Sequence, residues 1–88
     1  MYEIFLDYPA QRFIKTLSEE KKKKVLDAIE VLSPNPYLGK NLVGRLSGLR
    51  SLRTDNYRII YKIEDVKLLV LVLRIGYRGD IYSRKIGK

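Results

Sequence analysis

The stretch RSLRTDNYRIIY, residues 50–61, predicts a tight β-hairpin. β-Branched and aromatic residues flank the pair Asp55-Asn56, and these two residue types favour turns. We therefore expect two antiparallel strands, near residues 49–54 and 57–63, joined by a turn centred on that pair.

The predicted hairpin separates its charged and apolar side chains onto two faces. A turn centred at this point places Arg53 directly opposite Arg58. Leu52 then faces Ile59 on the other side, where it would enter a core. Facing like charges cost about 0.2–1 kcal/mol, and an anion bound between them would reverse the sign. In the alternative, each arginine pairs with a carboxylate of the chain, for which the candidates are Asp55, Glu64 and Asp80.

The segments around the hairpin predict one further strand, two helices and a long loop. Tyr2–Leu6 has the composition of a short strand, and apolar residues at helical spacing predict a helix over residues 8–17. Ser18, followed by two glutamates, begins a second helix, and the prolines and glycines of residues 34–48 form the loop. The apolar run of residues 67–75 predicts a central strand covered on both faces for most of its length.

The order of these elements predicts an α+β fold. An N-terminal strand, an antiparallel helical hairpin and a three-stranded antiparallel meander suit a mainly antiparallel sheet with both helices packed on one face. A chain of 88 residues is short for two domains, so we expect a single domain over residues 1–88. The other face of the sheet stays open for function.

Composition limits the chemistry that this domain can perform. The chain has neither cysteine nor histidine, so disulfides, thiolate nucleophiles and the usual general base are excluded, and we expect neither a metal nor a cofactor. The longest apolar run, residues 68–73, is far shorter than the roughly 20 residues of a membrane-spanning helix. With no recognisable signal peptide, we predict a cytoplasmic protein without membrane contact.

Positive charge is concentrated in the second half of the chain. The formal net charge is +8, and seven of the eight arginines follow residue 44. Arginine binds phosphate through a planar two-point fork, so a polyanionic partner is indicated. The run Lys21–Lys24 is interpreted as a solvated helix face, because its side chains point around the axis beside Glu19 and Glu20.

The far end of the third strand should bring another arginine to the hairpin. In an antiparallel meander this end returns beside the start of the preceding strand, so Arg78 lands near Arg58 and Arg53. Tyr77 and Tyr82 follow closely, as aromatic rings on which a base could stack or as phenols that could move a proton.

Two segments of the chain resemble the toxins of the RelE/ParE superfamily. They are GLRSLRTDNYRIIYKI, residues 48–63, and LVLRIGYRGDIY, residues 71–82, behind an N-terminal strand and a helical hairpin. The resemblance implies the toxin of a type II toxin–antitoxin system. It further implies a ribosome-dependent mRNA endonuclease that cleaves without metal, through attack of a ribose 2′-hydroxyl on the adjacent phosphate. The implied partners are the ribosome, mRNA and a RelB-like antitoxin, acidic and helical.

The resemblance also implies which residues act. Arg58 matches the family's phosphate-binding arginine, Arg78 its later arginine, and Tyr82 its C-terminal tyrosine. Arg53 matches a basic position before the turn, and these four residues are the predicted catalytic set. Ser51 departs from the pattern, because the family usually has a basic residue there, and the general base is left unassigned. The predicted RNA-binding residues are Lys40, Arg45, Arg50, Ser51, Lys62 and Tyr77.

Two other functions are compatible with the same resemblance. A ParE-type toxin would bind and inhibit a type II topoisomerase without cutting nucleic acid. A plain RNA-binding domain would have lost the chemistry at Ser51. A supercoiling assay identifies the first, and cleavage on a programmed ribosome excludes the second.

Overall fold

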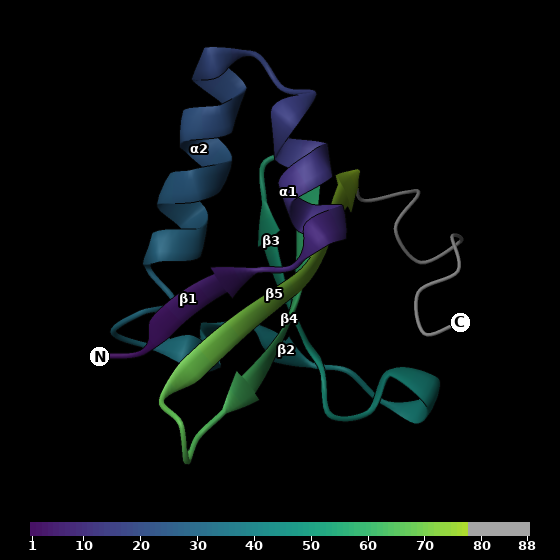
Figure 1. Cartoon of the computed structure of the whole chain (residues 1–88). Helices are drawn as coiled ribbons and strands as arrows, with labels where there is room; N and C mark the ends of the chain where they lie inside the picture. Colours follow the sequence, from purple (N-terminus) through teal and green to yellow (C-terminus); the bar gives the residue numbers. More distant parts are fainter. Residues whose placement is uncertain (78–88) are drawn as a thin grey trace.

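A computed structural model of the chain describes residues 1–77. The predicted Arg78 and Tyr82 lie outside the described residues. Two helices lie together on one side of a sheet, as Figure 1 shows, which confirms the α+β prediction. The elements in chain order are β1 (Glu3–Leu6), α1 (Tyr8–Lys15), α2 (Glu19–Glu30), the 3₁₀ turn η1 (Pro36–Leu38), β2 (Lys40–Asn41), the 3₁₀ turn η2 (Gly44–Leu46), β3 (Arg50–Thr54), β4 (Tyr57–Glu64) and β5 (Leu69–Tyr77).

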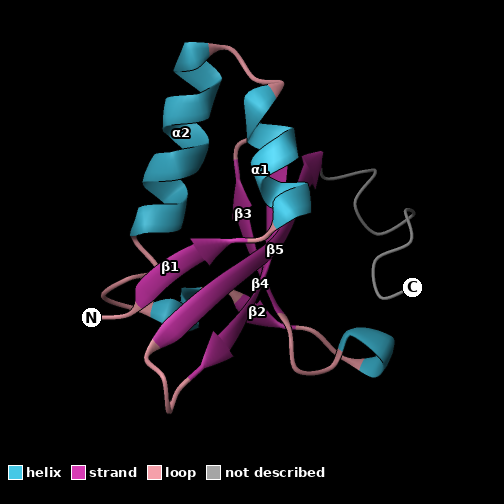
Figure 2. Cartoon of the chain, viewed as in Figure 1, coloured by secondary structure: helices cyan, strands magenta, loops and turns pink. Residues whose placement is uncertain are grey.

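The sheet has five strands in the order β1-β5-β4-β3-β2 (Figure 2). The predicted meander of β3, β4 and β5 is confirmed, and β1 joins it in parallel beside β5. β2 lies within the segment predicted to be loop, where Lys40 pairs with Ser51 and Asn41 pairs with Arg50. A strand of two residues is too short to show an alternating pattern, so the prediction missed it.

Both helices begin with a side-chain cap, and the second begins after Ser18, as predicted. The Asp7 carboxylate accepts a hydrogen bond from the backbone N–H of Tyr8, and the Ser18 hydroxyl accepts one from the N–H of Lys21. These contacts satisfy amides that have no partner inside the helix. The helices face the sheet with one apolar side each, formed by Ala10, Ile14, Val25 and Ile29.

The core lies between the helices and one face of the sheet. Leu52 and Ile59 occupy opposed positions and both join this core, as the hairpin predicts. The fully buried sheet residues against the helices are Ile59, Tyr61, Val70 and Val72. Burial of this apolar area is the main stabilising term for so short a chain.

β5 differs from its prediction on the face away from the helices. Leu69, Leu71 and Leu73 are only partly buried there, so the cover that was expected on both faces is incomplete on this one. A β-bulge also interrupts the pairing: Tyr61 pairs with Val72 while Ile60 pairs with Arg74. The extra residue reverses the alternation, so that Ile75 enters the core beside the helices and Arg74 shares the open face with Ile60.

The open face is partly covered by the loop between β2 and β3. Ile60 projects to this face and is fully buried beneath three leucines of that loop, Leu42, Leu46 and Leu49. Gly44 and Gly48 have φ angles of 68° and 93°, which glycine adopts without strain and which let the loop fold back. The sequence prediction of a fully open face was therefore wrong around Ile60.

Tyr61 anchors the segment that precedes this loop. Its hydroxyl donates a hydrogen bond of 2.7 Å to the carbonyl oxygen of Pro36 and accepts one of 2.9 Å from the N–H of Gly39. Gly39 lies close to β3, and a Cβ at this position would be only 2.8 Å from the carbonyl oxygen of Ser51. The buried phenol thus ties η1 and β2 to the middle of the sheet.

Candidate nucleic-acid interface

Arg53 and Arg58 face each other across the hairpin, as predicted. The turn between them is tight, since Thr54 pairs with Tyr57 and Asp55 has a φ angle of 54°. Arg53 is exposed, whereas Arg58 is half-buried. Both side chains belong to the sheet face opposite the helices, so two positive charges are presented together on a surface that a ligand can reach.

Ser51 supports Arg58 rather than facing solvent. The serine is only 5% exposed, and its Oγ accepts a hydrogen bond of 3.5 Å from Nη1 of Arg58. Its neighbours in register are Lys40 on β2 and Ile60 on β4. At the position where the resemblance implies a basic side chain, this chain therefore has a small buried hydroxyl beside the Arg58 guanidinium.

The end of β5 returns to the start of β4, as the meander predicts. Gly76 lies opposite Arg58 and has no side chain to fill the space beside it, and Tyr77 lies opposite Tyr57. Tyr77 belongs to the helix face, where its ring centroid is 5.4 Å from those of Phe13 and Tyr57. This ring is 47% exposed, but the structure does not bring it to the face that carries Arg58.

Arg74 is a basic residue of this face that sequence reasoning missed. Arg74 pairs with Ile60, and it precedes by two residues Gly76, the residue that pairs with Arg58. Its place depends on the bulge, because uninterrupted alternation from Val72 would have turned it toward the helices. A bulge leaves no reliable signal in a run of leucines and valines.

Three further predicted RNA-binding residues lie on elements next to the arginine pair. Lys40 lies beside Ser51 at the edge of the sheet, and Arg45 is exposed in the loop that covers Ile60. Lys62 lies further along β4, where its Nζ forms an ion pair of 3.1 Å with Glu64. The alternative in which each arginine pairs with a carboxylate is not seen for Arg53, which forms no ion pair within residues 1–77. Of the candidate carboxylates, Glu64 pairs with Lys62 and Asp80 lies outside the described residues.

Arg50 occupies the opposite side of β3 from Ser51. Its guanidinium donates hydrogen bonds to the side chain of Asn41 at 2.8 Å and to the carbonyl oxygen of Gly39 at 2.8 Å. The same group lies 5.2 Å from the centroid of the Tyr37 ring. These contacts join β3 to η1 and β2, so the structure does not bring Arg50 together with Arg53 and Arg58.

Tyr37 continues into a small network at the turn between β4 and β5. The hydroxyls of Tyr2 and Tyr37 each donate a hydrogen bond of 2.6 Å to the carboxylate of Asp65. These bonds lower the pKa of Asp65, and they raise the pKa of both tyrosines because the carboxylate disfavours a phenolate. The network ties the N-terminus and η1 to the turn.

The lowered pKa of Asp65 predicts a loss of stability in acid. A carboxylate with a depressed folded-state pKa stabilises the fold fully above its ordinary value of 3.8, and this contribution disappears as the pH falls through the folded-state pKa. Tyr2→Phe removes the largest cause and should shift the pKa of Asp65 upward in a carboxyl NMR titration. Titration of wild-type Asp65 at its ordinary value would contradict this prediction.

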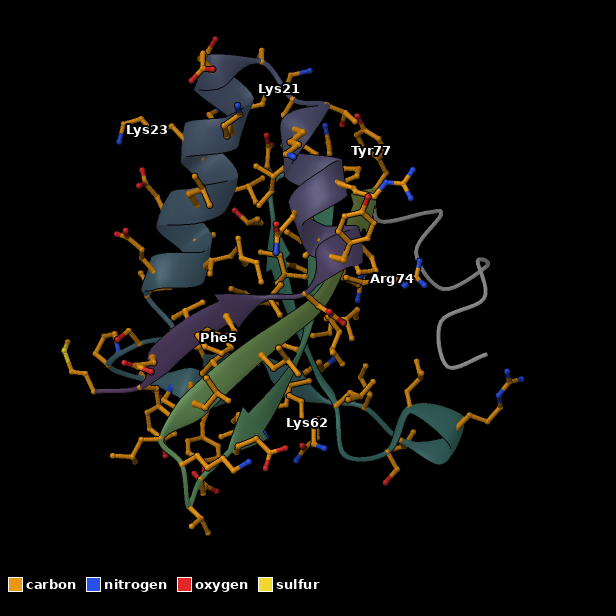
Figure 3. All side chains as sticks on the ribbon, in the orientation of Figure 1. Phe5, Lys21, Lys23, Lys62, Arg74 and Tyr77 are labelled. Carbon is orange, nitrogen blue, oxygen red and sulfur yellow. The ribbon has the colours of Figure 1, made fainter. Side chains whose placement is uncertain are left out.

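The lysine run Lys21–Lys24 takes no part in this interface. Lys22 pairs with Glu19, Lys23 pairs with Asp27, and Figure 3 shows Lys21 and Lys23 on different sides of α2. Within residues 1–77 no cluster of three or more acidic side chains could hold a metal ion. In the same part of the chain, no helix is both long and apolar enough to span a membrane.

Two helices packed on a five-stranded mixed sheet also form the fold of chains solved in toxin–antitoxin complexes. A family model described as "ParE toxin of type II toxin-antitoxin system, parDE" matches residues 4–82. The chain therefore belongs to this family of type II toxin–antitoxin toxins, within the RelE/ParE superfamily.

Relatives and solved structures agree with this assignment. Toxin RelG of Mycobacterium tuberculosis is 43% identical over 47 residues, which span 53% of this chain and only about half, 54%, of RelG. The mRNA interferase toxin RelE of Escherichia coli is 30% identical over 78 residues, which span 81% of this chain and 75% of that protein. The toxin–antitoxin complex RelBE2 of M. tuberculosis contains a chain with a TM-score of 0.81 and 30% identity, covering 88% of this chain and 98% of that one.

The fold is also that of a toxin solved without its antitoxin. The isolated E. coli RelE toxin has a TM-score of 0.76 at 20% identity, covering 98% of this chain and 96% of that one. At this identity the likeness concerns the fold alone.

Proposed function

We propose that this toxin is a ribosome-dependent mRNA endonuclease. The observation that carries the proposal is the facing pair Arg53 and Arg58, with Ser51 beside it, on an accessible face of the sheet. Two guanidinium groups in opposed positions suit a phosphodiester better than a neutral ligand. The similarity to E. coli RelE, which is named an mRNA interferase, supports the same reaction.

The proposed reaction is an attack of a ribose 2′-hydroxyl on the adjacent phosphorus. The bond between O2′ and phosphorus forms as O2′ loses its proton to solvent, the bond to O5′ breaks as O5′ takes a proton from solvent, and a 2′,3′-cyclic phosphate and a 5′-hydroxyl result. Arg53 and Arg58 stabilise the extra negative charge of the pentacovalent phosphorane, and Arg78 and Tyr82 complete the proposed site. Arginine keeps its proton at neutral pH, so the guanidinium groups hold charge and do not move the 2′ proton.

The proposed partners follow from the charge of the molecule and from its relatives. A cognate antitoxin, RelB-like, acidic and helical, would cover the basic sheet face of a chain with net charge +8. The M. tuberculosis RelBE2 structure is a toxin–antitoxin complex, which supports this partner. Ribosomes and mRNA are the proposed targets, in the cytoplasm, with Lys40, Arg45 and Lys62 as outer contacts to the RNA backbone.

Primer extension on a defined mRNA tests the proposal. Purified toxin should cut the message when it is bound to ribosomes, at sites within the translated frame. Growth arrest in cells with every translated message intact would reject the nuclease. The cut should also be made in the presence of a metal chelator that leaves the ribosomes intact.

A second candidate function rests on the family model, whose description names ParE. A ParE-type protein would bind a type II topoisomerase and cut no RNA. Inhibition of supercoiling by purified toxin, with no cleavage on programmed ribosomes, would favour this function over the first.

A further inference from the structure

A hollow of about 320 Å³ lies between α1 and the end of β5. β1 runs beside β5 only as far as Val72, whose carbonyl oxygen accepts the last hydrogen bond of this edge, from the N–H of Asp7. Beyond that point no strand of residues 1–77 pairs with this edge of β5. Figure 3 shows Arg74 and Tyr77 along this end of β5, next to α1. The lining residues are Pro9, Arg12, Phe13, Thr16, Arg74 and Ile75.

Two arginines from different elements make this hollow positively charged. Arg12 comes from α1 and Arg74 from β5, and neither forms an ion pair or a hydrogen bond within residues 1–77. The Arg12 guanidinium instead lies 5.6 Å from the centroid of the exposed Tyr8 ring. Two guanidinium groups that line one hollow without a carboxylate suit an anion.

The remaining walls of the hollow suit the apolar part of a ligand. Pro9, Phe13 and Ile75 supply hydrocarbon surface, and the Thr16 hydroxyl is already bonded to the carbonyl oxygen of Phe13 at 2.7 Å. Ligand sites of about 300 Å³ and more accommodate small organic molecules. The combination of arginines and an apolar wall fits a nucleotide better than a simple inorganic ion.

The hollow continues the line of arginines that begins at the hairpin. Arg58 lies opposite Gly76, and Arg74 lies two residues further along β5, at the unpaired edge of this strand, where its side chain also lines the hollow beside α1. A phosphodiester chain held at Arg58 can therefore cross β5 toward its unpaired edge, where it meets Arg74 and then Arg12. Basic tracks with apolar or aromatic walls are typical of proteins that bind single strands.

We propose that this hollow is a second RNA-binding subsite, in which Arg12 and Arg74 bind a phosphate neighbouring the one held at Arg58, and Phe13 and Ile75 contact the attached nucleoside. The inference rests on the proposed function, since it assigns a further part of the same substrate. It adds two residues, Arg12 and Arg74, that neither the resemblance nor the hairpin indicates.

Binding of a non-cleavable trinucleotide tests the subsite without any catalytic step. In a ¹⁵N NMR titration with a 2′-O-methyl RNA trimer, the amides of Thr16, Arg74 and Ile75 should shift. The double variant Arg12→Gln/Arg74→Gln should weaken binding about tenfold or more, and should reduce the slope of log affinity against log salt by about 0.7, the value for one phosphate of a single strand. The control Lys21→Gln/Lys24→Gln removes the same charge from α2 and should change the affinity less than about twofold.

Kinetics of cleavage on programmed ribosomes distinguish a binding role of this subsite from a role in the chemical step. The Arg12→Gln/Arg74→Gln toxin should show a raised KM with kcat little changed, because it loses binding that is equal in substrate and transition state. A wild-type toxin that binds the trimer in the hollow but cuts no message would overturn the proposed function and leave the subsite standing. A toxin that cuts normally while the double variant binds the trimer as well as wild type does would overturn the subsite alone.

An acidic peptide is the competing occupant of the hollow. If a glutamate-rich decapeptide shifts the same amides at lower concentration than the trimer does, the RNA assignment is wrong. Equal melting temperatures of wild type and double variant would establish that the substitutions act on binding and not on folding.

Discussion

Arg58→Ala is expected to lower the rate of mRNA cleavage on programmed ribosomes by about 10²–10³-fold. Arg58 lies opposite Arg53, is half-buried, and has the buried Ser51 hydroxyl 3.5 Å from its Nη1, so its guanidinium lies among protein groups of the sheet face. A donor that is positioned in advance stabilises charge that develops in the transition state, and the loss should appear in kcat. Single-turnover cleavage of a defined message measures it.

Two matched variants make this result interpretable. Arg50→Ala removes the same side chain from the other face of the same hairpin, so it should reduce stability and leave kcat unchanged. Arg58→Lys keeps the charge without the two-point fork and should recover only part of the rate. Cleavage by Arg58→Ala at the wild-type rate would remove this arginine from the catalytic site.

Tyr61→Phe is expected to give the largest loss of stability from removal of a single atom. The Tyr61 hydroxyl bonds both the carbonyl oxygen of Pro36 and the N–H of Gly39, and the side chain is fully buried. Removal of the oxygen leaves two backbone groups without this partner, at about 1–3 kcal/mol for each buried group. Folded domains of this size have roughly 5–15 kcal/mol in total, so urea unfolding should show a clear shift of the midpoint.

Tyr57→Phe is the control for this measurement. Tyr57 is also buried on the helix face of β4, but its hydroxyl forms no hydrogen bond within residues 1–77. Its removal should change the free energy of unfolding by less than about 0.5 kcal/mol. Equal losses in the two variants would mean that the contacts of Tyr61 with Pro36 and Gly39 do not hold the loop segment in place.

Local chemistry explains why the arginine pair could be predicted. The register of a hairpin depends on its turn, and Asp55-Asn56 places Arg53 opposite Arg58 without reference to the rest of the chain. The helix start at Ser18 is equally local, because its hydroxyl accepts a hydrogen bond from an amide only three residues away. Leu52 packs against the core and Arg53 is exposed, because successive side chains of a strand point to opposite faces of the sheet.

The features that were missed depend on contacts between distant segments. The parallel pairing of β1 with β5, the short strand β2 and the cover over Ile60 join residues far apart in sequence. The outward position of Arg74 depends on a bulge, which the surrounding apolar run does not reveal. Arg50 shows the same limit, since only the folded loop supplies the oxygens that hold its guanidinium away from the arginine pair.

The sequence by itself thus determined the two helices, the hairpin register and the excess of positive charge in the second half of the chain, because each depends on neighbouring residues or on composition. Only the tertiary structure decided which basic side chains share a surface. A guanidinium is directed by the residues packed and bonded around it, and for Arg50, Arg58 and Arg74 most of those residues come from other strands and loops.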